Sequence, residues 1–204
     1  MLKNMKFKTS AFNIQGLLKT DKKQIVLVGK SNVGKSSFIN TLANRKQLAK
    51  VGSNPGKTKS INYYDVNNEF YLVDLPGYGY SNMTKKEKEN TSNLINYYIE
   101  NNENISHIFF LVDIRHKPTE NDRIMYDWLL SKSIPFTIIA TKADKIGPVK
   151  REENINVIRK TLFAKEDIIP FSSEKKLNIE LIEKIIQKNN VWNIILGSLS
   201  MVGV

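Results

Sequence analysis

Residues 29–37, with the sequence GKSNVGKSS, decide the fold of this 204-residue chain. They lie between the apolar segments IVLV and FINTL, which predict a buried strand before them and a helix after them. Gly29 and Gly34 bracket four residues, and a lysine and a serine follow at once. A glycine-bracketed loop between a strand and a helix, ending in Lys-Ser, is the pattern of a phosphate-binding loop, or P-loop.

The residue types in this loop suit a nucleoside triphosphate. A Cβ atom at Gly29 or Gly34 would obstruct the approach of backbone N–H groups to a phosphate. Lys35 can neutralise the β- and γ-phosphate oxygens, and the Ser36 hydroxyl can bind Mg²⁺. A glycine-rich turn without a ligand is the alternative, and the complete pattern argues against it. The predicted phosphate-binding residues are Gly29, Lys30, Ser31, Asn32, Val33, Gly34, Lys35, Ser36 and Ser37.

A second segment, DLPGYGY at residues 74–80, follows another predicted strand. Asp74 can hold Mg²⁺ through water, and the N–H group of Gly77 can contact the γ-phosphate and move when that phosphate leaves. The letters DLPG alone also occur as an ordinary strand-to-turn sequence. Their position after a P-loop, with one hairpin between, favours a role in nucleotide binding.

The segment TKAD at residues 141–144 predicts that the base is guanine. Asp144 can accept hydrogen bonds from N1–H and the N2 amino group of guanine, whereas adenine has no donors there. Because an unpaired buried carboxylate is costly, Asp144 would select against adenine. Lys142, next to Thr141, can lay its aliphatic stem over the base. Further along, Ser172 and Ser173 can direct their backbone N–H groups to guanine O6, which makes GTP and GDP the predicted ligands.

Short apolar runs alternate with helical patterns along the chain, which predicts an α/β fold with a doubly wound sheet. We expect a P-loop NTPase G domain with a mostly parallel six-stranded sheet. One strand should be antiparallel, because Asn67 and Asn68 mark a hairpin. The expected strands are 24–29, 60–66, 69–74, 107–113, 135–140 and 167–171, and the expected helices are 35–43, 85–101, 119–132, 149–163 and 175–189. Residues 1–22 are predicted to be an N-terminal extension packed on a G domain at 23–189, and 190–204 an apolar tail without an assigned function.

The composition restricts the class of protein and of partner. The chain has no cysteine, which excludes disulfides and cysteine-based metal sites. No segment reaches the roughly 20 apolar residues of a membrane span, so we expect a cytoplasmic protein. The net charge of +11 favours an anionic partner such as nucleic acid, although a generally lysine-rich composition is an alternative. His107 and His116 have no carboxylate or cysteine at ligand spacing, and we expect both to be structural or surface residues.

The segments VGKSNVGKSSFIN, NPGKTKSINYY and LVDLPGYGY closely resemble the EngB/YihA/YsxC family, within the TRAFAC class of small GTPases. The resemblance covers roughly residues 9–189. Its members are bacterial and organellar GTPases implicated in assembly of the large ribosomal subunit. The resemblance therefore implies an Mg²⁺-dependent GTPase that acts on the large subunit or its rRNA, with links to the cell cycle, cell division and septation. Two departures are Lys59, where glutamine is expected, and the apolar tail.

The resemblance also assigns residues to the reaction. Thr58 corresponds to the switch I threonine, which reaches Mg²⁺ and the γ-phosphate in the GTP state, and Gly56 lies in the same nucleotide-binding loop. Residues 76–86 correspond to switch II. The implied catalytic residues are Lys35, Thr58 and Gly77, and the implied metal ligands are Ser36, Thr58 and Asp74.

Tyr78 stands where a Ras-like enzyme carries the glutamine that orients the attacking water. Tyrosine is poorly suited to that task, so we expect slow intrinsic hydrolysis, on the order of 10⁻⁴ s⁻¹ by analogy with unassisted Ras-type turnover. Asn32 suggests one way in which hydrolysis could be accelerated, because an asparagine at this position assists K⁺ binding in several bacterial relatives. Acceleration by K⁺ is a hypothesis. The alternative is that Asn32 only closes the turn of the loop.

Two other functions fit parts of the sequence. A metabolic nucleotide kinase would share the P-loop, but it leaves TKAD unexplained and the chain offers no lid-like insertion. A slow GTP-binding regulatory module, acting on a protein or a membrane, fits Tyr78 and the apolar tail. For either GTP-binding function we expect a monomer.

Overall fold

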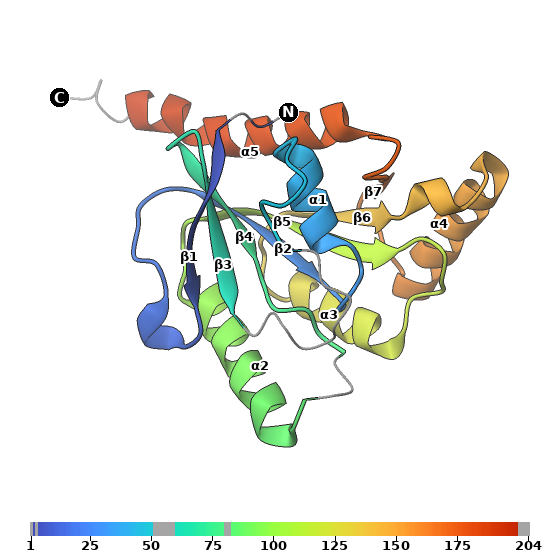
Figure 1. The fold of residues 1–204 in the computed structure, drawn as a ribbon, viewed down its shortest axis with the longest axis horizontal. Coiled ribbons are helices and arrows are strands. Elements are labelled where there is room, and N and C mark those ends of the chain that lie inside the picture. The colour runs from blue at the N-terminus through green and yellow to red at the C-terminus, as the bar shows by residue number, and fades with distance from the viewer. Residues whose placement is uncertain (1, 3, 51–59, 80–82, 200–204) are drawn as a thin grey trace.

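The computed structural model describes residues 2, 4–50, 60–79 and 83–199, with side chains up to residue 190 (Figure 1). Seven strands form one sheet in the order β1-β3-β4-β2-β5-β6-β7. Only β3 runs antiparallel to its neighbours, as expected from the hairpin signal. The strands are β1 (Met5–Ala11), β2 (Gln24–Gly29), β3 (Ile61–Val66), β4 (Phe70–Asp74), β5 (Ile105–Asp113), β6 (Phe136–Thr141) and β7 (Ile168–Pro170).

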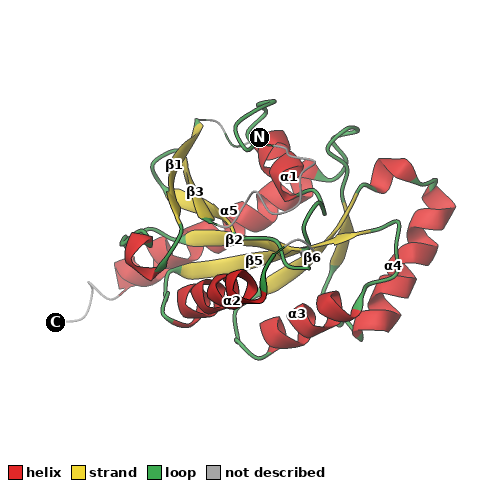
Figure 2. Ribbon diagram, turned by 60° about the horizontal axis from the view of Figure 1, so that its bottom comes forward, coloured by secondary structure: helices red, strands yellow, loops and turns green. Residues whose placement is uncertain are grey.

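Helices cover both faces of the sheet, which confirms the predicted α/β class (Figure 2). The helices are α1 (Lys35–Leu42), α2 (Lys85–Glu100), α3 (Glu120–Leu130), α4 (Pro148–Leu162) and α5 (Ile179–Leu199). Buried side chains of α2, α3 and α4 share one apolar cluster with one face of the sheet. Those of α1 and α5 share a second cluster with the other face. Burial on both faces explains why the central strands are continuous apolar runs.

The sheet has one strand more than the six expected, because β1 forms within the predicted N-terminal extension. β1 pairs with β3 along the edge of the sheet, from Met5 opposite Val66 to Ala11 opposite Ile61. Lys6 and Lys8 are exposed, whereas Met5 is buried. Apolar and basic residues alternate in MKFK, which is a strand signal, but the basic character of the segment concealed it. The burial does not follow this alternation, because Phe7 is 51% exposed.

The hairpin between β3 and β4 forms as predicted. Asn67 and Asn68 have φ angles of 53° and 61°, in the left-handed region that a tight two-residue hairpin turn requires. The N–H group of Glu69 donates to the carbonyl of Val66 at 2.9 Å and closes the turn. The hairpin brings β4 beside β2, so Asp74 lies next to the P-loop strand.

Helix α5 begins and ends later than predicted. It starts at Ile179 rather than at 175, because Lys176 and Asn178 have φ angles of 52° and 60° that a right-handed helix does not allow. It then continues to Leu199, through the position where the apolar tail was expected to begin. Among the described residues, no helix combines the length and apolar character that a membrane crossing requires.

Candidate functional site

The P-loop joins β2 to α1, and its two glycines are needed for different reasons. Gly34 has a φ of +113° where it precedes α1, a conformation that L side chains rarely adopt. A Cβ atom on Gly29 would lie 2.8 Å from the Leu111 carbonyl oxygen and 2.9 Å from Cγ1 of Val33. Gly34 therefore permits the turn into the helix, and Gly29 permits close packing of the loop on β5.

The N-terminus of α1 is open for an anion. No side chain caps this helix, so the N–H groups of its first turn, at Lys35, Ser36 and Ser37, have no side-chain acceptor at the cap position. The positive end of the helix dipole adds to their attraction for a phosphate. The end of the predicted phosphate-binding loop therefore suits a phosphate.

Lys35 and Asp74 meet beneath the loop, with Nζ of Lys35 at 3.8 Å from Oδ1 of Asp74. Lys35 is 9% exposed and Asp74 is 3% exposed. Burial raises the pKa of Asp74 above its ordinary value, and the charge of Lys35 acts against that rise. Oδ1 has no hydrogen-bond partner within the described part of the chain. An under-satisfied carboxylate beside a P-loop fits the expected donor set for hydrated Mg²⁺, together with the Ser36 hydroxyl.

The segment after β4 lies directly on the P-loop. A Cβ atom on Gly77 would lie 2.9 Å from the Ser31 nitrogen and 3.2 Å from Nζ of Lys35. The N–H group of Ser31 donates to the Tyr78 carbonyl at 3.0 Å. The structure therefore brings Gly77 to the P-loop and Lys35, and only a residue without a Cβ atom fits there.

Tyr78 reaches from this segment to α3, where its hydroxyl donates to Oδ1 of Asp122 at 2.7 Å. Oδ2 of Asp122 also accepts from the N–H group and the hydroxyl of Thr119, at 2.7 and 2.6 Å, and so caps the helix. Burial, followed by the charge of Asp122, raises the pKa of Tyr78 well above its ordinary value. Asp122 was not among the predicted site residues. Its only sequence signal is the Thr-x-x-Asp start of α3.

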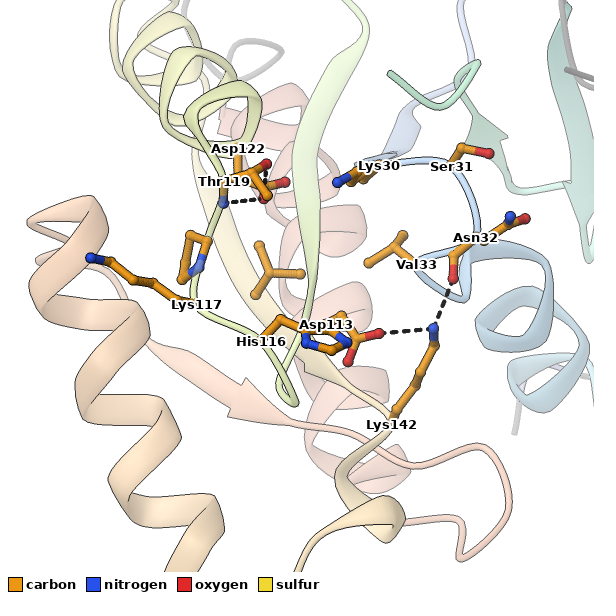
Figure 3. Close-up of a pocket in the computed structure, with 12 residues that line it drawn as sticks. Lys30, Ser31, Asn32, Val33, Asp113, His116, Lys117, Thr119, Asp122 and Lys142 are labelled. Carbon is orange, nitrogen blue, oxygen red and sulfur yellow. Dashed lines mark hydrogen bonds and ion pairs between the residues drawn. The ribbon is translucent and has the colours of Figure 1, made fainter. Parts of the chain in front are cut away.

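Thr141 and Lys142 support the P-loop from β6. The Thr141 hydroxyl lies 2.7 Å from the Val33 carbonyl oxygen and 3.0 Å from that of Val112. Nζ of Lys142 donates to the Asn32 carbonyl at 2.8 Å and pairs with Oδ2 of Asp113 at 2.9 Å (Figure 3). The polar groups of Thr141 and Lys142 thus hold the loop in place.

Asp113, at the end of β5, is a supporting residue that the sequence analysis did not single out. Burial acts to raise its pKa, but hydrogen bonds and charge from Arg115 and Lys142 outweigh burial and lower the pKa to about 2. Asp113 is therefore ionised and anchors Lys142. The one signal for it was its place at the carboxyl end of a central strand, where ligand sites of such sheets lie.

Asp144 is fixed in position beside the loop after β7. The Ser172 hydroxyl donates to Oδ1 at 2.7 Å, and Nζ of Lys145 lies 3.0 Å from Oδ2. Burial opposes ionisation, but these hydrogen bonds outweigh it and lower the pKa of Asp144. A fixed, ionised carboxylate is what reading the guanine N1–H and N2 groups requires. Ser173 follows Ser172 in the same loop.

The structure brings two sets of predicted residues together: Lys35, Asp74 and Gly77 with the P-loop, and Asp144 with Ser172. Asn32 is exposed, with a left-handed φ of 61°, which fits a turn as well as a ligand role. Gly56 and Thr58 lie outside the described residues, as does Lys59. Of the predicted switch II at 76–86, residues 80–82 also lie outside them.

Comparisons with known proteins agree with this geometry. The family model described as "50S ribosome-binding GTPase" matches residues 24–142. A "Probable GTP-binding protein EngB" of Thermoanaerobacter pseudethanolicus is 44% identical over 188 residues, which cover 92% of this chain and 98% of the relative. The protein described in the same words from Clostridioides difficile is 48% identical over 170 residues, with 82% and 84% covered.

Solved structures show the same fold. A crystal structure of a probable GTP-binding protein EngB superposes with a TM-score of 0.69 at 26% identity, covering 81% of this chain and 97% of that one. A crystal structure of Era superposes with a TM-score of 0.66 at 24% identity, covering 84% of this chain and 57% of that one, and supports the fold alone.

Proposed function

The chain belongs to the EngB family of GTP-binding proteins, and from this premise we propose that it hydrolyses GTP slowly as a switch in assembly of the large ribosomal subunit. The observation that carries the GTPase part is the placement of two carboxylates. Asp74 lies 3.8 Å from the P-loop lysine, and Asp144 is held by Ser172 at 2.7 Å. The Asp74 carboxylate suits a hydrated metal ion at the phosphates, and the Asp144 carboxylate suits the guanine base.

Different residues of the site have different proposed roles in the reaction. In this proposal the first turn of α1 and Lys35 bind the phosphates, and Gly77, which packs against Ser31 and Lys35, offers its N–H group to the γ-phosphate. Ser36, Thr58 and Asp74 are the proposed ligands of Mg²⁺, directly or through water. When bound, the ion offsets negative charge on the β- and γ-phosphates. Water attacks the γ-phosphorus as the bond to the β-γ bridging oxygen breaks, which yields GDP and phosphate.

The position of Tyr78 supports the proposed slow turnover. Its side chain extends to Asp122 and donates its hydroxyl there, so it is turned to α3 rather than to a water at the phosphates. Hydrolysis without assistance then depends on positioning and charge alone. K⁺ near Asn32 remains our hypothesis for such assistance. Equal turnover in KCl and NaCl at matched ionic strength would exclude it.

The ribosomal part of the proposal rests on charge and on the family. The chain carries 31 Lys and Arg residues against 20 Asp and Glu, and the matching family model is described as ribosome-binding. A positively charged protein gains affinity for RNA through counterion release. We propose a cytoplasmic monomer that binds the large subunit or its rRNA. The implied links to cell division are part of the same proposal.

Co-sedimentation with separated ribosomal subunits tests this function. We expect the protein to pellet with the large subunit, more strongly with a non-hydrolysable GTP analogue than with GDP, and less at high salt. The matched control is Lys35→Ala, which should lose the difference between the two nucleotides. No pelleting in either state would favour the second candidate, a GTP-binding regulatory module. Its specific support is Tyr78 at the place of a catalytic glutamine.

A further inference from the structure

A cavity of about 280 Å³ lies behind the P-loop, between the loop and the start of α3 (Figure 3). On one side it is lined by Lys30, Asn32 and Val33 of the P-loop. The segment between β5 and α3 lines the other side, including His116 and Thr119.

The cavity shares five lining residues with the predicted nucleotide site, namely Lys30, Ser31, Asn32, Val33 and Lys142. Lys35 and Asp74, which would meet the phosphates and metal, do not line it, and neither do Asp144 and Ser172 at the guanine end. Lys142 forms the boundary, because its ammonium group is bound to Asn32 and Asp113 between the two spaces. An occupant of the cavity would therefore adjoin a bound GTP or GDP, away from Lys35, Asp74 and Asp144.

We propose that this cavity binds one unstacked nucleotide of single-stranded RNA, with the base inside and its phosphates at the rim. The inference rests on the proposed ribosomal function, and it names the surface that would read the RNA. Proteins commonly recognise RNA by taking such unpaired bases into pockets that combine stacking and hydrogen bonds.

The lining of the cavity suits a base. Val33 and Val112 are buried and, with Pro118, offer apolar contact to a flat ring. His116 is exposed at the opening and supplies a ring on which a base can stack.

The charge of the cavity suits the phosphates on either side of that base. Of its two carboxylates, Asp113 is paired with Arg115 and Lys142, whereas Asp122 is held by hydrogen bonds from the neutral groups of Tyr78 and Thr119. The ammonium groups of Lys30 and Lys117 remain, and neither has an ion-pair partner within the described part of the chain.

These two ammonium groups occupy different depths. Lys30 points across the cavity to Thr119 and Asp122, while Lys117 extends outward from the rim (Figure 3). The net positive charge, inside and at the opening, is complementary to an RNA backbone.

The position of the cavity would couple RNA to the nucleotide switch. Asp122 lines the cavity and accepts the hydrogen bond of Tyr78 at 2.7 Å. Lys30 also lines it and forms a parallel bridge with Tyr78. An occupant would therefore contact the two elements that hold the segment after Gly77 in place.

The test is fluorescence anisotropy of a labelled five-nucleotide oligoadenylate with the full chain, saturated with GDP so that the nucleotide site is filled. His116→Ala should weaken binding about tenfold through lost stacking. Lys117→Ala should weaken it and reduce the salt slope by about 0.7, the value for one phosphate of a single strand. Lys160→Ala, an exposed lysine of α4, is the matched control and should change neither quantity. GDP affinity should be unchanged in all three variants.

Two outcomes overturn the proposal: wild-type protein that does not bind the oligomer, or His116→Ala protein that binds it within twofold of wild type. Co-sedimentation of the same proteins with the large subunit separates this failure from failure of the proposed function. If wild-type protein pellets but His116→Ala protein binds the oligomer normally, only the cavity assignment is wrong. If wild-type protein does not pellet, the ribosomal function itself is wrong.

Discussion

The Tyr78 hydroxyl lies 2.7 Å from Oδ1 of Asp122, so the segment after β4 is bound to the first turn of α3. The two residues are 44 positions apart in the chain. The backbone carbonyl of the same tyrosine accepts a hydrogen bond from the Ser31 N–H group. One residue of the expected switch II is thus linked both to the P-loop and to a neighbouring helix.

Tyr78→Phe should lower the free energy of unfolding by about 1–3 kcal/mol, because it removes a hydrogen bond to a buried carboxylate. Urea denaturation of the nucleotide-free protein measures this change. Tyr97→Phe is the control, since Tyr97 is 42% exposed and its hydroxyl has no hydrogen bond within the described chain. Equal stability of the two variants would show that the hydrogen bond of Tyr78 does not contribute to the free energy of unfolding.

Gly77→Ala should slow GTP hydrolysis while GDP affinity changes little. The added Cβ atom would lie 2.9 Å from the Ser31 nitrogen, so the segment must move away from the P-loop. Gly147→Ala is the matched control, because nothing lies within 4 Å of a Cβ atom at that position. Single-turnover hydrolysis measures the effect. An unchanged rate for Gly77→Ala would mean that this close approach has no part in the reaction.

Lys35→Ala should weaken GDP and GTP binding at least about a hundredfold. It removes the phosphate-binding charge and leaves the buried Asp74 without its cationic partner, 3.8 Å away. Isothermal titration with each nucleotide gives the affinities, and Lys165→Ala serves as the control for loss of one exposed lysine. Unchanged affinity would remove the P-loop assignment.

Asp144→Asn should shift the preference from guanine to xanthine nucleotides, because an amide donates a hydrogen bond where the carboxylate accepted one. The Ser172 hydroxyl can still donate to the amide oxygen, so the loop should keep its position. Competition of GDP against XDP in an equilibrium binding assay reports the preference. A preference that stays with GDP would show that Asp144 does not read the base.

The unfolding free energy should decrease as the pH falls from about 6.5 toward 4. Burial of His107 lowers its pKa from 6.5 to about 4 in the folded protein. The unfolded chain therefore binds a proton in this window before the folded protein does, and the loss reaches up to about 3 kcal/mol. Urea denaturation at several pH values measures it. His107→Phe should flatten the dependence, whereas His116→Ala should keep it, and equal slopes would exclude His107 as the cause.

Local patterns in the sequence were sufficient for most of the fold. The apolar run of β2, the glycine-bracketed loop and the Asn-Asn hairpin each depend on neighbouring residues, and all three formed as predicted. β1 was missed because its alternation is short and basic. The start of α5 was missed because Lys176 and Asn178 adopt left-handed φ angles that their residue types do not demand.

By itself, the sequence determined the P-loop class, the guanine-type TKAD segment and the family resemblance, since each depends on residue types at fixed spacing along the chain. Only the tertiary structure decided what surrounds these residues. Asp113 anchors Lys142, Ser172 fixes Asp144, and Asp122 holds Tyr78, each across a long separation in sequence. The physical reason is that the parallel sheet gathers the ends of distant strands at one edge. Hydrogen bonds between those ends have no periodic signature in the chain.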